Sequence, residues 1–286
     1  MLLDVTHSTE MLYNPSISET VMELRLRPLD DDTQRCLQFD LQIDPNGNVA
    51  LTKDSFGNAI HHFNFRPPHR RIMAVSHSIV ETGLGTAVTS PALFRFQFLS
   101  FDGPIQQLPM IDQLAASLRP ARADDPAEVE ASLEKLTQLV NQRFRYQKGV
   151  TSTRSTVSDL EGIGGGVCQD FAHYWVAVSR AMRIPARYVS GYIHHQVGDD
   201  IFVGATGASH AWGEGWIPGR GWCGFDPTNP VHVGDHHVKL AVGRDYRDVP
   251  PTKGIFDGPA SETISVNVET RRLDRLPPGI IGRLSA

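Results

Sequence analysis

This chain has 286 residues, which is long enough for one large domain or two modest ones. Apolar residues make up 40% of it and charged residues 21%, close to the average for soluble globular proteins. Its net charge of −5, with scattered lysines and arginines, excludes the dense basic surface of a nucleic-acid-binding protein.

Membrane insertion and secretion are not indicated either. The sequence has no run of about 18 apolar residues. Its start, MLLDVTHSTE, lacks the basic and apolar regions of a signal peptide. The three cysteines, Cys36, Cys168 and Cys223, are too few and too scattered for a disulfide framework. We therefore expect free thiols and a cytoplasmic location.

Residues 1–100 have the pattern of β-strands separated by turns. The segments TVMELRLRPL, RCLQFDLQID and NVALTKDSF alternate in polarity or are rich in β-forming residues, with turn signals at 45–48, 56–58 and 66–68. No chemical motif stands out, and the adjacent His61 and His62 fit one inward and one outward side chain on a strand. Short strands at this spacing suggest a small antiparallel sandwich or barrel, and we expect an N-terminal all-β sandwich domain over residues 1–100.

Residues 101–125 differ in composition from the strands before them, being rich in proline and polar residues. They are predicted to form a linker with a short helix near 110–117. A clear helix follows, because Asp124 or Asp125 can cap it and Pro126 suits its first position. Its buried stripe has helical spacing and consists of Val129, Leu133, Leu136, Val140 and Phe144. With the helix and strands that come next, this predicts an α+β domain over residues 101–286.

A second helix opens at Cys168, after three glycines, and ends before Pro185. The positive end of a helix stabilises a thiolate. Gly164 to Gly166 have no side chains, so a substrate backbone could approach the sulfur closely. The first-turn N–H groups lack helical partners and can donate to a developing oxyanion. This placement suits a nucleophile, although a small buried thiol would pack equally well there.

A thiol nucleophile needs a base, and His210 is the best candidate among twelve histidines. In SHAWGEGWI it shares one strand face with Trp212, Glu214 and Trp216, and small residues occupy the other face. Taken alone, a packed core histidine would explain the same position.

The base needs an orienting group, and Asp226 lies on the next strand. A regular four-residue loop over 218–221 would point His210 and Asp226 to opposite faces. A three-residue loop, or a glycine bulge, would set Asp226 opposite Trp212 and diagonal to His210. Asp226 could then accept the His210 ring N–H and fix its tautomer. The alternative is that Asp226 only starts a turn with Pro227.

Gln169, Asp170, Trp212 and Glu214 have weaker claims to a role at this site, near the oxyanion or in support of His210. Asp170, which follows Cys168 and Gln169, is most simply a charge at a helix start, with contact to a substrate amine as the alternative. Glu214 could support His210 or simply be solvated. The run GRDYRDVPP at 243–251 is most simply a surface ion-pair cluster, with a part in rimming the cleft left open.

Metal binding is not expected. The histidines at 194–195, 232 and 236–237 show no zinc-site spacing and look like parts of polar loops. Cys223 lies on the strand that leads to Asp226 and faces away from it by alternation, so we expect a buried, inert thiol.

Three stretches resemble the bacterial transglutaminase-like superfamily: GVCQDFAHYWVAVSRAMRIPARYVSGY, SHAWGEGWIPGRGWCGFDPTN and AVGRDYRDVPPTKGIFDG. The first hundred residues, including DVTHSTEMLYNPSISETVMELRLRP and DSFGNAIHHF, resemble the small β domain that precedes the catalytic core in many bacterial members. The resemblance implies a papain-like α+β core with a Cys-His-Asp triad. Cys168 falls on the nucleophile, His210 on the base and Asp226 on the orienting acid.

The chemistry implied by this resemblance is acyl transfer on amide bonds through a thioester. We expect a cysteine peptidase or amidase that acts on proteins or peptides, without a metal, calcium or another cofactor. Glutamine–amine transfer and a catalytically idle binding module are the alternatives.

Some family features do not transfer. No tryptophan precedes Cys168, and glycines replace the papain-type glutamine, so the second oxyanion donor stays open. Its candidates are the Cys168 N–H and, by similarity to a Phe-x-Tyr stretch, Tyr146.

Overall fold

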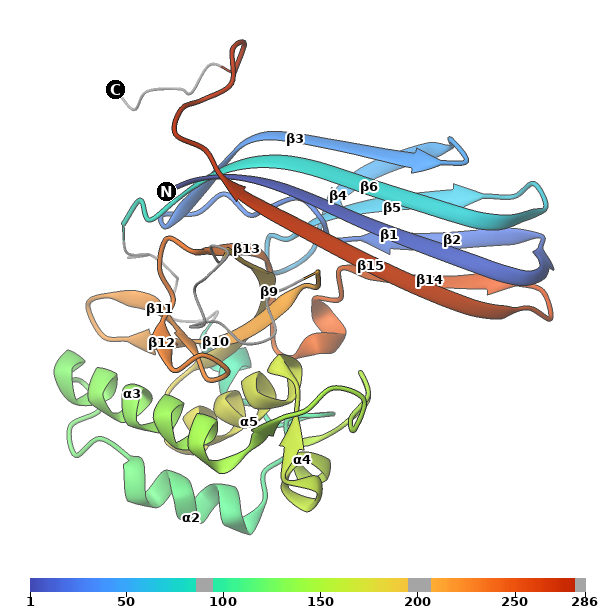
Figure 1. Cartoon of the computed structure of the whole chain (residues 1–286). Helices are drawn as coiled ribbons and strands as arrows, with labels where there is room; N and C mark the ends of the chain where they lie inside the picture. The colour runs from blue at the N-terminus through green and yellow to red at the C-terminus, as the bar shows by residue number, and fades with distance from the viewer. Residues whose placement is uncertain (86–94, 195–206, 281–286) are drawn as a thin grey trace.

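A computed structural model of the chain describes residues 1–85, 95–194 and 207–280. The described residues form a long β-sandwich, which packs against a second unit made of helices and one antiparallel sheet (Figure 1). No helix among these residues is both long enough and apolar enough to cross a membrane.

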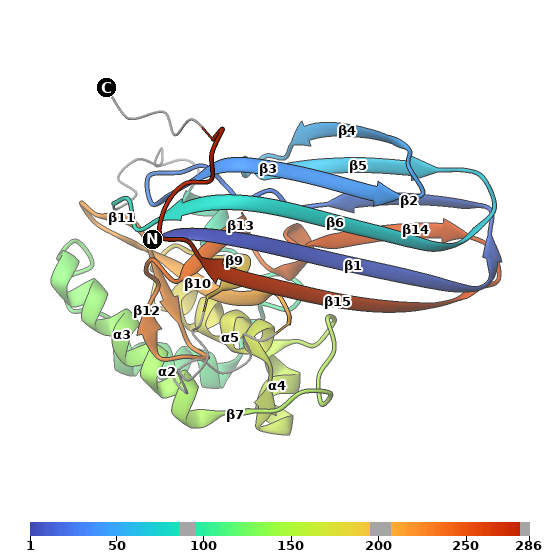
Figure 2. The same cartoon turned by 45° about the horizontal axis from the view of Figure 1, so that its top comes forward.

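The sandwich consists of two four-stranded antiparallel sheets, seen as separate layers in Figure 2. One sheet has the order β15 (Ser261–Arg272), β1 (Leu2–Ile17), β6 (His69–Thr82), β3 (Gln34–Asp44). The other has the order β14 (Thr252–Asp257), β2 (Glu19–Leu24), β5 (Ala59–Phe65), β4 (Asn48–Lys53). Alternate residues of β1 are buried, as expected for a strand with one face toward a core. The prediction of an N-terminal all-β sandwich is confirmed.

The end of the chain differs from the predicted division at residue 100. β15 pairs with β1 along twelve residue pairs, from Leu3–Arg272 to Asn14–Ser261, and β14 pairs with β2. Residues 252–272 therefore complete both sheets of the N-terminal domain instead of belonging to the α+β unit. The alternation of Ile264, Val266 and Val268 was a strand signal that the sequence analysis did not use.

The α+β unit has a five-stranded sheet with helices against one face. Its strand order is β12 (Val231–His232), β11 (Gly221–Asp226), β10 (His210–Ile217), β9 (Ala186–Ile193), β13 (His237–Gly243). The helices are α2 (Pro109–Leu118), α3 (Pro126–Arg143), α4 (Val157–Ile163) and α5 (Cys168–Ala181). Shorter pieces are the 3₁₀ turns η1 (Phe96–Leu99) and η2 (Tyr246–Asp248) and the two-residue parallel pair β7 (Arg145–Tyr146) and β8 (Gly165–Gly166).

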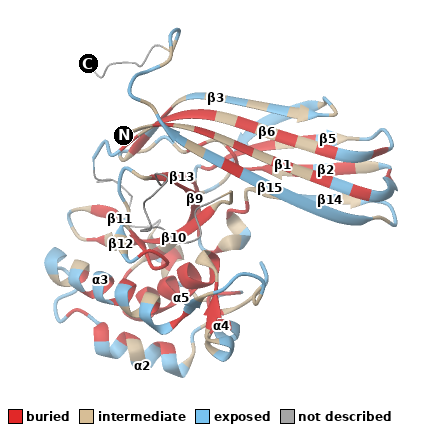
Figure 3. Cartoon of the chain, in the orientation of Figure 1, coloured by how far each residue is buried: buried red, intermediate tan, exposed pale blue. Residues whose placement is uncertain are grey.

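Helix α5 is the centre of this unit. Its residues from 169 to 181 are all buried, whereas α2 and α3 keep an exposed outer face (Figure 3). The glycines of β10 make the close packing possible, because a Cβ on Gly213 would lie 2.2 Å from the Trp175 ring. Trp175 also stacks on Phe225, and its indole N–H donates to Thr137 at 2.9 Å. In α3, Asp125 supplies the predicted cap, accepting the N–H groups of residues 127 and 128.

The two units meet at β13, whose outer edge has no strand partner among the described residues. Side-chain amides of the sandwich take the place of one. The Gln34 amide donates to the Lys239 carbonyl at 2.8 Å and accepts the Lys239 N–H at 2.7 Å. Asn58 forms the same two-way contact with Val242, at 2.8 Å in both directions. The sandwich thus covers an edge that would otherwise leave backbone groups unpaired.

Candidate active site

The structure brings the three predicted residues to neighbouring element ends. Cys168 opens α5, His210 opens β10 and Asp226 ends β11. Ile217 pairs with Gly221, so β10 and β11 are joined by the three-residue loop 218–220. Continued to its end, this register sets Asp226 opposite Trp212. The three-residue alternative of the sequence analysis is therefore confirmed.

His210 and Asp226 form a buried pair. The His210 Nε2 lies 2.7 Å from Asp226 Oδ2, and both side chains are completely buried. This bond does not involve the other ring nitrogen, Nδ1. Within the described part of the chain, Nδ1 has no hydrogen-bond partner.

The Asp226 carboxylate is held by several further donors. Oδ1 accepts the backbone N–H groups of Thr228 at 2.9 Å and Asn229 at 3.2 Å. Oδ2 accepts the Asn229 side-chain amide at 3.0 Å, and His237 Nε2 lies 3.5 Å from it. Burial opposes ionisation, but His210 and His237 outweigh it and hold the pKa of Asp226 far below its usual range. Asp226 is therefore a fixed negative charge beside His210.

This charge decides the protonation of His210. Burial lowers the pKa of the imidazole, but the charge and hydrogen bond of Asp226 raise it more strongly, and Cys168 raises it further. The result is a pKa of about 10 for His210, so the ring is an imidazolium at neutral pH. Cys168 packs against a cluster that includes Ala211, the residue after His210.

The His210–Asp226 pair predicts a stability that depends on pH once the thiol is removed. In Cys168→Ala, Asp226 still raises the folded-state pKa of His210 above the unfolded value of about 6.5. The stabilisation is then fully present below about pH 6.5 and is lost as pH rises toward the folded-state pKa. Urea unfolding should show a loss of up to about 1.4 kcal/mol per pH unit between pH 6.5 and 8.5.

The matched control for this prediction is the double variant Cys168→Ala/His210→Gln, which should lack that slope. The wild-type chain should show a smaller slope than Cys168→Ala, because a Cys168 thiolate would release the proton that His210 takes up. An equal slope in the double variant would assign the effect to other groups.

Three tyrosines surround the thiol. Burial, followed by the charges of Cys168 and Asp226, raises the pKa of Tyr146 to about 12. Burial and then Cys168 also raise the pKa values of Tyr188 and Tyr246. Tyr146 is positioned by pairing of β7 with β8, where it lies opposite Gly166. Of these three tyrosines, only Tyr146 is a candidate from the sequence; Tyr188 and Tyr246 are identified by the structure.

Asp170 caps the helix that presents Cys168. Its Oδ2 accepts the Val167 N–H at 2.8 Å and the Thr151 hydroxyl at 2.7 Å. Gly166 makes room for this carboxylate, because a Cβ there would lie 2.6 Å from the same oxygen. The simple interpretation of Asp170 as a helix-start charge thus describes its contacts. Gln169 is buried and donates to the Thr153 carbonyl at 3.2 Å.

Glu214 is not solvated, contrary to one of the two readings of the sequence. It is buried and forms ion pairs with Arg187 at 2.5 Å and with Lys239 at 2.7 Å. Lys239 Nζ also contacts Asp31 at 2.7 Å, so this network crosses from the α+β unit into the sandwich. Trp212 packs against both site histidines, with its ring centre 6.1 Å from His210 and 5.2 Å from His237. Both residues support the strands that carry the site.

The GRDYRDVPP run forms the expected ion pairs. Arg244 contacts Asp248 at 2.9 Å, and Arg247 contacts Asp245 and Asp102 at 2.8 Å each. The run also supplies Tyr246 to the surroundings of Cys168, so it borders the site as well as the surface.

The interpretation of residues 236–237 as part of a polar loop is wrong for His237. This side chain is buried and faces Asp226. His237 Nε2, His210 Nε2 and Asp226 Oδ2 lie within 4.8 Å of one another, a set that could hold a metal ion. Hydrogen-bond donors already surround both Asp226 oxygens, which favours a hydrogen-bonded carboxylate over a metal ligand. Of the other histidines considered for zinc, His195 lies outside the described residues.

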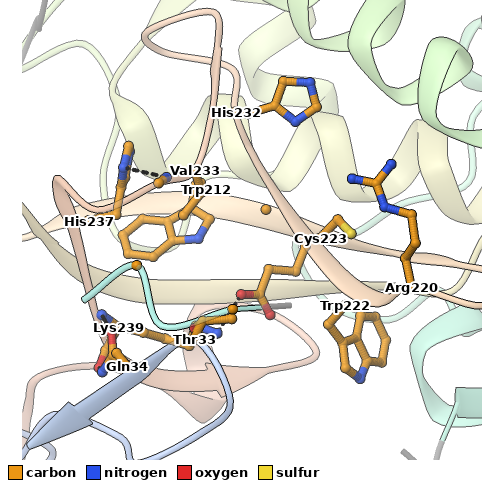
Figure 4. Close-up of a pocket in the computed structure, with 15 residues that line it drawn as sticks. Thr33, Gln34, Trp212, Arg220, Trp222, Cys223, His232, Val233, His237 and Lys239 are labelled. Carbon is orange, nitrogen blue, oxygen red and sulfur yellow. Dashed lines mark hydrogen bonds and ion pairs between the residues drawn. The ribbon is translucent and has the colours of Figure 1, made fainter. Parts of the chain in front are cut away.

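A cavity of about 150 Å³ lies where the two units meet (Figure 4). Trp212, His237 and Lys239 line it from the α+β unit, and Thr33 and Gln34 from the sandwich. Cys223 is another lining residue, and burial raises the pKa of its thiol. Cys168 is not among the residues that line this cavity. The cavity therefore adjoins Trp212 and His237, which pack against His210, and not the Cys168 thiol.

Comparisons with known proteins cover both units. Residues 3–81 match the bacterial transglutaminase-like N-terminal region, and residues 113–227 match the transglutaminase-like superfamily core. An uncharacterized protein of Mycobacterium leprae is 33% identical over 280 residues, which cover 94% of this chain and 98% of the relative. A relative in Mycobacterium tuberculosis, also uncharacterized, is 31% identical and covers 93% of this chain and 91% of its own.

Two further similarities bear on fold and chemistry. A crystal structure of a candidate cysteine protease from Cytophaga hutchinsonii has a TM-score of 0.72 and 23% identity, and covers 97% of this chain and 93% of its own. It supports the papain-like fold with an N-terminal β domain. A protein-glutamine gamma-glutamyltransferase of Pseudomonas aeruginosa is 32% identical over 147 residues, which are 48% of this chain and 21% of that protein.

Proposed function

This chain belongs to the transglutaminase-like superfamily, and we propose that it carries out acyl transfer on amide bonds with Cys168 as the nucleophile. The observation that carries the proposal is the buried His210–Asp226 pair beside Cys168. An imidazolium fixed by a buried carboxylate stabilises a neighbouring thiolate. The placement of Cys168 at the start of α5 adds the favourable end of the helix dipole.

The proposed reaction begins when the Cys168 thiolate attacks the carbonyl carbon of an amide. The C–S bond forms while the carbonyl π pair moves onto oxygen. The C–N bond then breaks, the departing nitrogen takes the His210 proton, and a thioester remains. Water attacks this thioester and passes one proton to His210; the new C–O bond forms, the C–S bond breaks, and a carboxylic acid and the Cys168 thiolate are released. An amine in place of water gives a new amide.

The oxyanion of this reaction needs donors near the Cys168 sulfur. The Cys168 backbone N–H is one candidate, since it lies in the first turn of α5. Tyr146 is the proposed second donor. It stays protonated at neutral pH because burial raises its pKa to about 12, and the charge of Cys168 acts on it.

Hydrolysis and amine transfer share the same thioester. We place hydrolysis of a protein or peptide amide first, because it needs only water as the second reactant, whereas transfer needs a further site for an amine. The glutamyltransferase of Pseudomonas aeruginosa supports transfer as the second candidate. The free cysteines fit a reducing compartment, so a cytoplasmic location is part of the proposal.

The test is product analysis with a library of glutamine-containing peptides, with and without a fluorescent primary amine. Hydrolysis should give cleaved or deamidated peptides by mass spectrometry, and transfer should give amine adducts. Cys168→Ala is the control. Equal product in wild type and control would overturn the proposal and leave an idle binding module as the better account.

A further inference from the structure

One segment of the α+β unit makes several hydrogen bonds with the sandwich. This segment, residues 234–242, runs from the turn after β12 through most of β13. The Thr82 hydroxyl donates to the Asp235 carbonyl at 2.5 Å, at one end. The amides of Gln34 and Asn58 hold Lys239 and Val242, farther along. Gln34 and Asn58 are both buried, so these contacts are shielded from water.

His237 lies inside the held segment, two residues from Lys239. Figure 4 shows Gln34 beside Lys239, and His237 and Trp212 along the same cavity. The Gly234 N–H donates to His237 Nδ1 at 3.4 Å, which makes Nδ1 an acceptor. Burial lowers the pKa of His237, so its ring is neutral at pH 7. A neutral ring with an accepting Nδ1 carries its proton on Nε2, which faces Asp226 Oδ2.

The contact between His237 and Asp226 is long, at 3.5 Å, and lies at the limit of a hydrogen bond. A small displacement of β13 therefore breaks it. The same Asp226 oxygen accepts from His210, so the position of this oxygen sets the His210 ring. The route from the sandwich to Asp226 is thus short: Gln34 contacts β13, β13 carries His237, and His237 adds a donor to those that Thr228 and Asn229 already give the Asp226 carboxylate.

We propose that the N-terminal sandwich helps to position the active-site residues. It holds β13 so that His237 positions Asp226 against His210. The effect of this positioning on catalysis rests on the proposed function. His237 is a positioning residue, since it acts on the chemistry only through Asp226 and His210. Removing a hydrogen bond to a charged group typically changes an equilibrium about 10- to 100-fold.

The test follows the His210 Nε2 proton by NMR in the full-length chain labelled with ¹⁵N-histidine. His237→Leu removes the donor to Asp226, and His237→Gln restores an N–H at the same distance along the side chain. Gln34→Leu removes both side-chain contacts with Lys239, beside His237, and leaves the Leu29 N–H bonded to the Lys239 carbonyl at 3.0 Å. Asn58→Leu removes an equally buried two-way contact with β13, but five residues from His237. It is therefore the matched control for loss of stability alone.

We expect His237→Leu to speed exchange of the His210 Nε2 proton with solvent at least tenfold, and His237→Gln to stay within about threefold of wild type. Gln34→Leu should speed exchange more than Asn58→Leu does. Unchanged exchange in a folded His237→Leu would overturn the proposal. Equal effects of Gln34→Leu and Asn58→Leu would also overturn it, because the sandwich would then act on stability only. Gln34→Glu replaces the leucine variant if that fails to fold, since it keeps the acceptor for Lys239 N–H.

Alkylation of Cys168 separates this proposal from the proposed function. If Cys168 reacts as an ordinary thiol while His237→Leu still loosens the His210 proton, only the proposed function fails. If Cys168 is activated and His237→Leu changes neither readout, only the positioning role fails.

Discussion

Replacing Cys168 with alanine is expected to lower amide turnover by at least ~1,000-fold while leaving the fold intact. The large effect follows from its proposed role, because the thioester cannot form without the sulfur. The fold should survive because Cys168 is only partly buried and opens its helix, whose cap is Asp170. The measurement is turnover of the peptides identified by product analysis, with circular dichroism as the check of folding.

The matched control is Cys223→Ser. Cys223 is another partly buried thiol of the same unit, on β11, which ends at Asp226. It should keep wild-type turnover to within about threefold. If Cys168→Ala retained more than a tenth of the activity, the nucleophile would have to be another group.

Replacing Lys239 with methionine is expected to lower the free energy of unfolding by about 3 kcal/mol. The Lys239 ammonium is buried and contacts both Glu214 and Asp31 at 2.7 Å. Without it, Arg187 is the one ionic partner left to Glu214 among the residues that the structure describes, and the buried charge of Glu214 is poorly compensated. The remaining Arg187 pair places the effect at the lower end of the range for a broken buried ion pair.

Urea unfolding at pH 7 measures this change, and Lys148→Met is the control. Lys148 is exposed, so its replacement should change stability by less than about 0.5 kcal/mol. A loss for Lys239→Met no larger than that of the control would mean that the buried network contributes little net stability.

Local signals in the sequence predicted the strands and the helix that carry the candidate site. Residues 210–217 form a strand within the stretch SHAWGEGWI, as expected, and Cys168 opens a helix as expected. The Cys168 helix ends near Pro185, and the turn between β10 and β11 has glycines at φ +72° and +83°. The same glycines made the three-residue loop plausible, and the loop length alone fixed the face of Asp226. These features depend on few neighbouring residues.

Contacts between distant segments were beyond the sequence analysis. The alternating pattern of β15 is visible in the sequence, but its pairing with β1, some 250 residues earlier, is not. His237 comes next to Asp226 only because the chain turns back after β12, and no local pattern marks that return. Glu214 was grouped with His210 by alternation, yet its ion pairs depend on Lys239, which comes from another strand. Helix α4 is short, at seven residues, and it was missed although Thr156 and Asp159 form a capping box.

The pH dependence of Cys168 alkylation by iodoacetamide, mapped residue by residue with mass spectrometry, tests the central claim most directly. Cys36 and Cys223 are controls within the same chain, and burial raises the pKa of Cys36 to about 11. If His210 holds Cys168 as a thiolate, its rate should change less than about threefold from pH 5 to 7, and His210→Ala should abolish this plateau. A rate that rises about 100-fold over the same range, as for an unactivated thiol, would contradict the account.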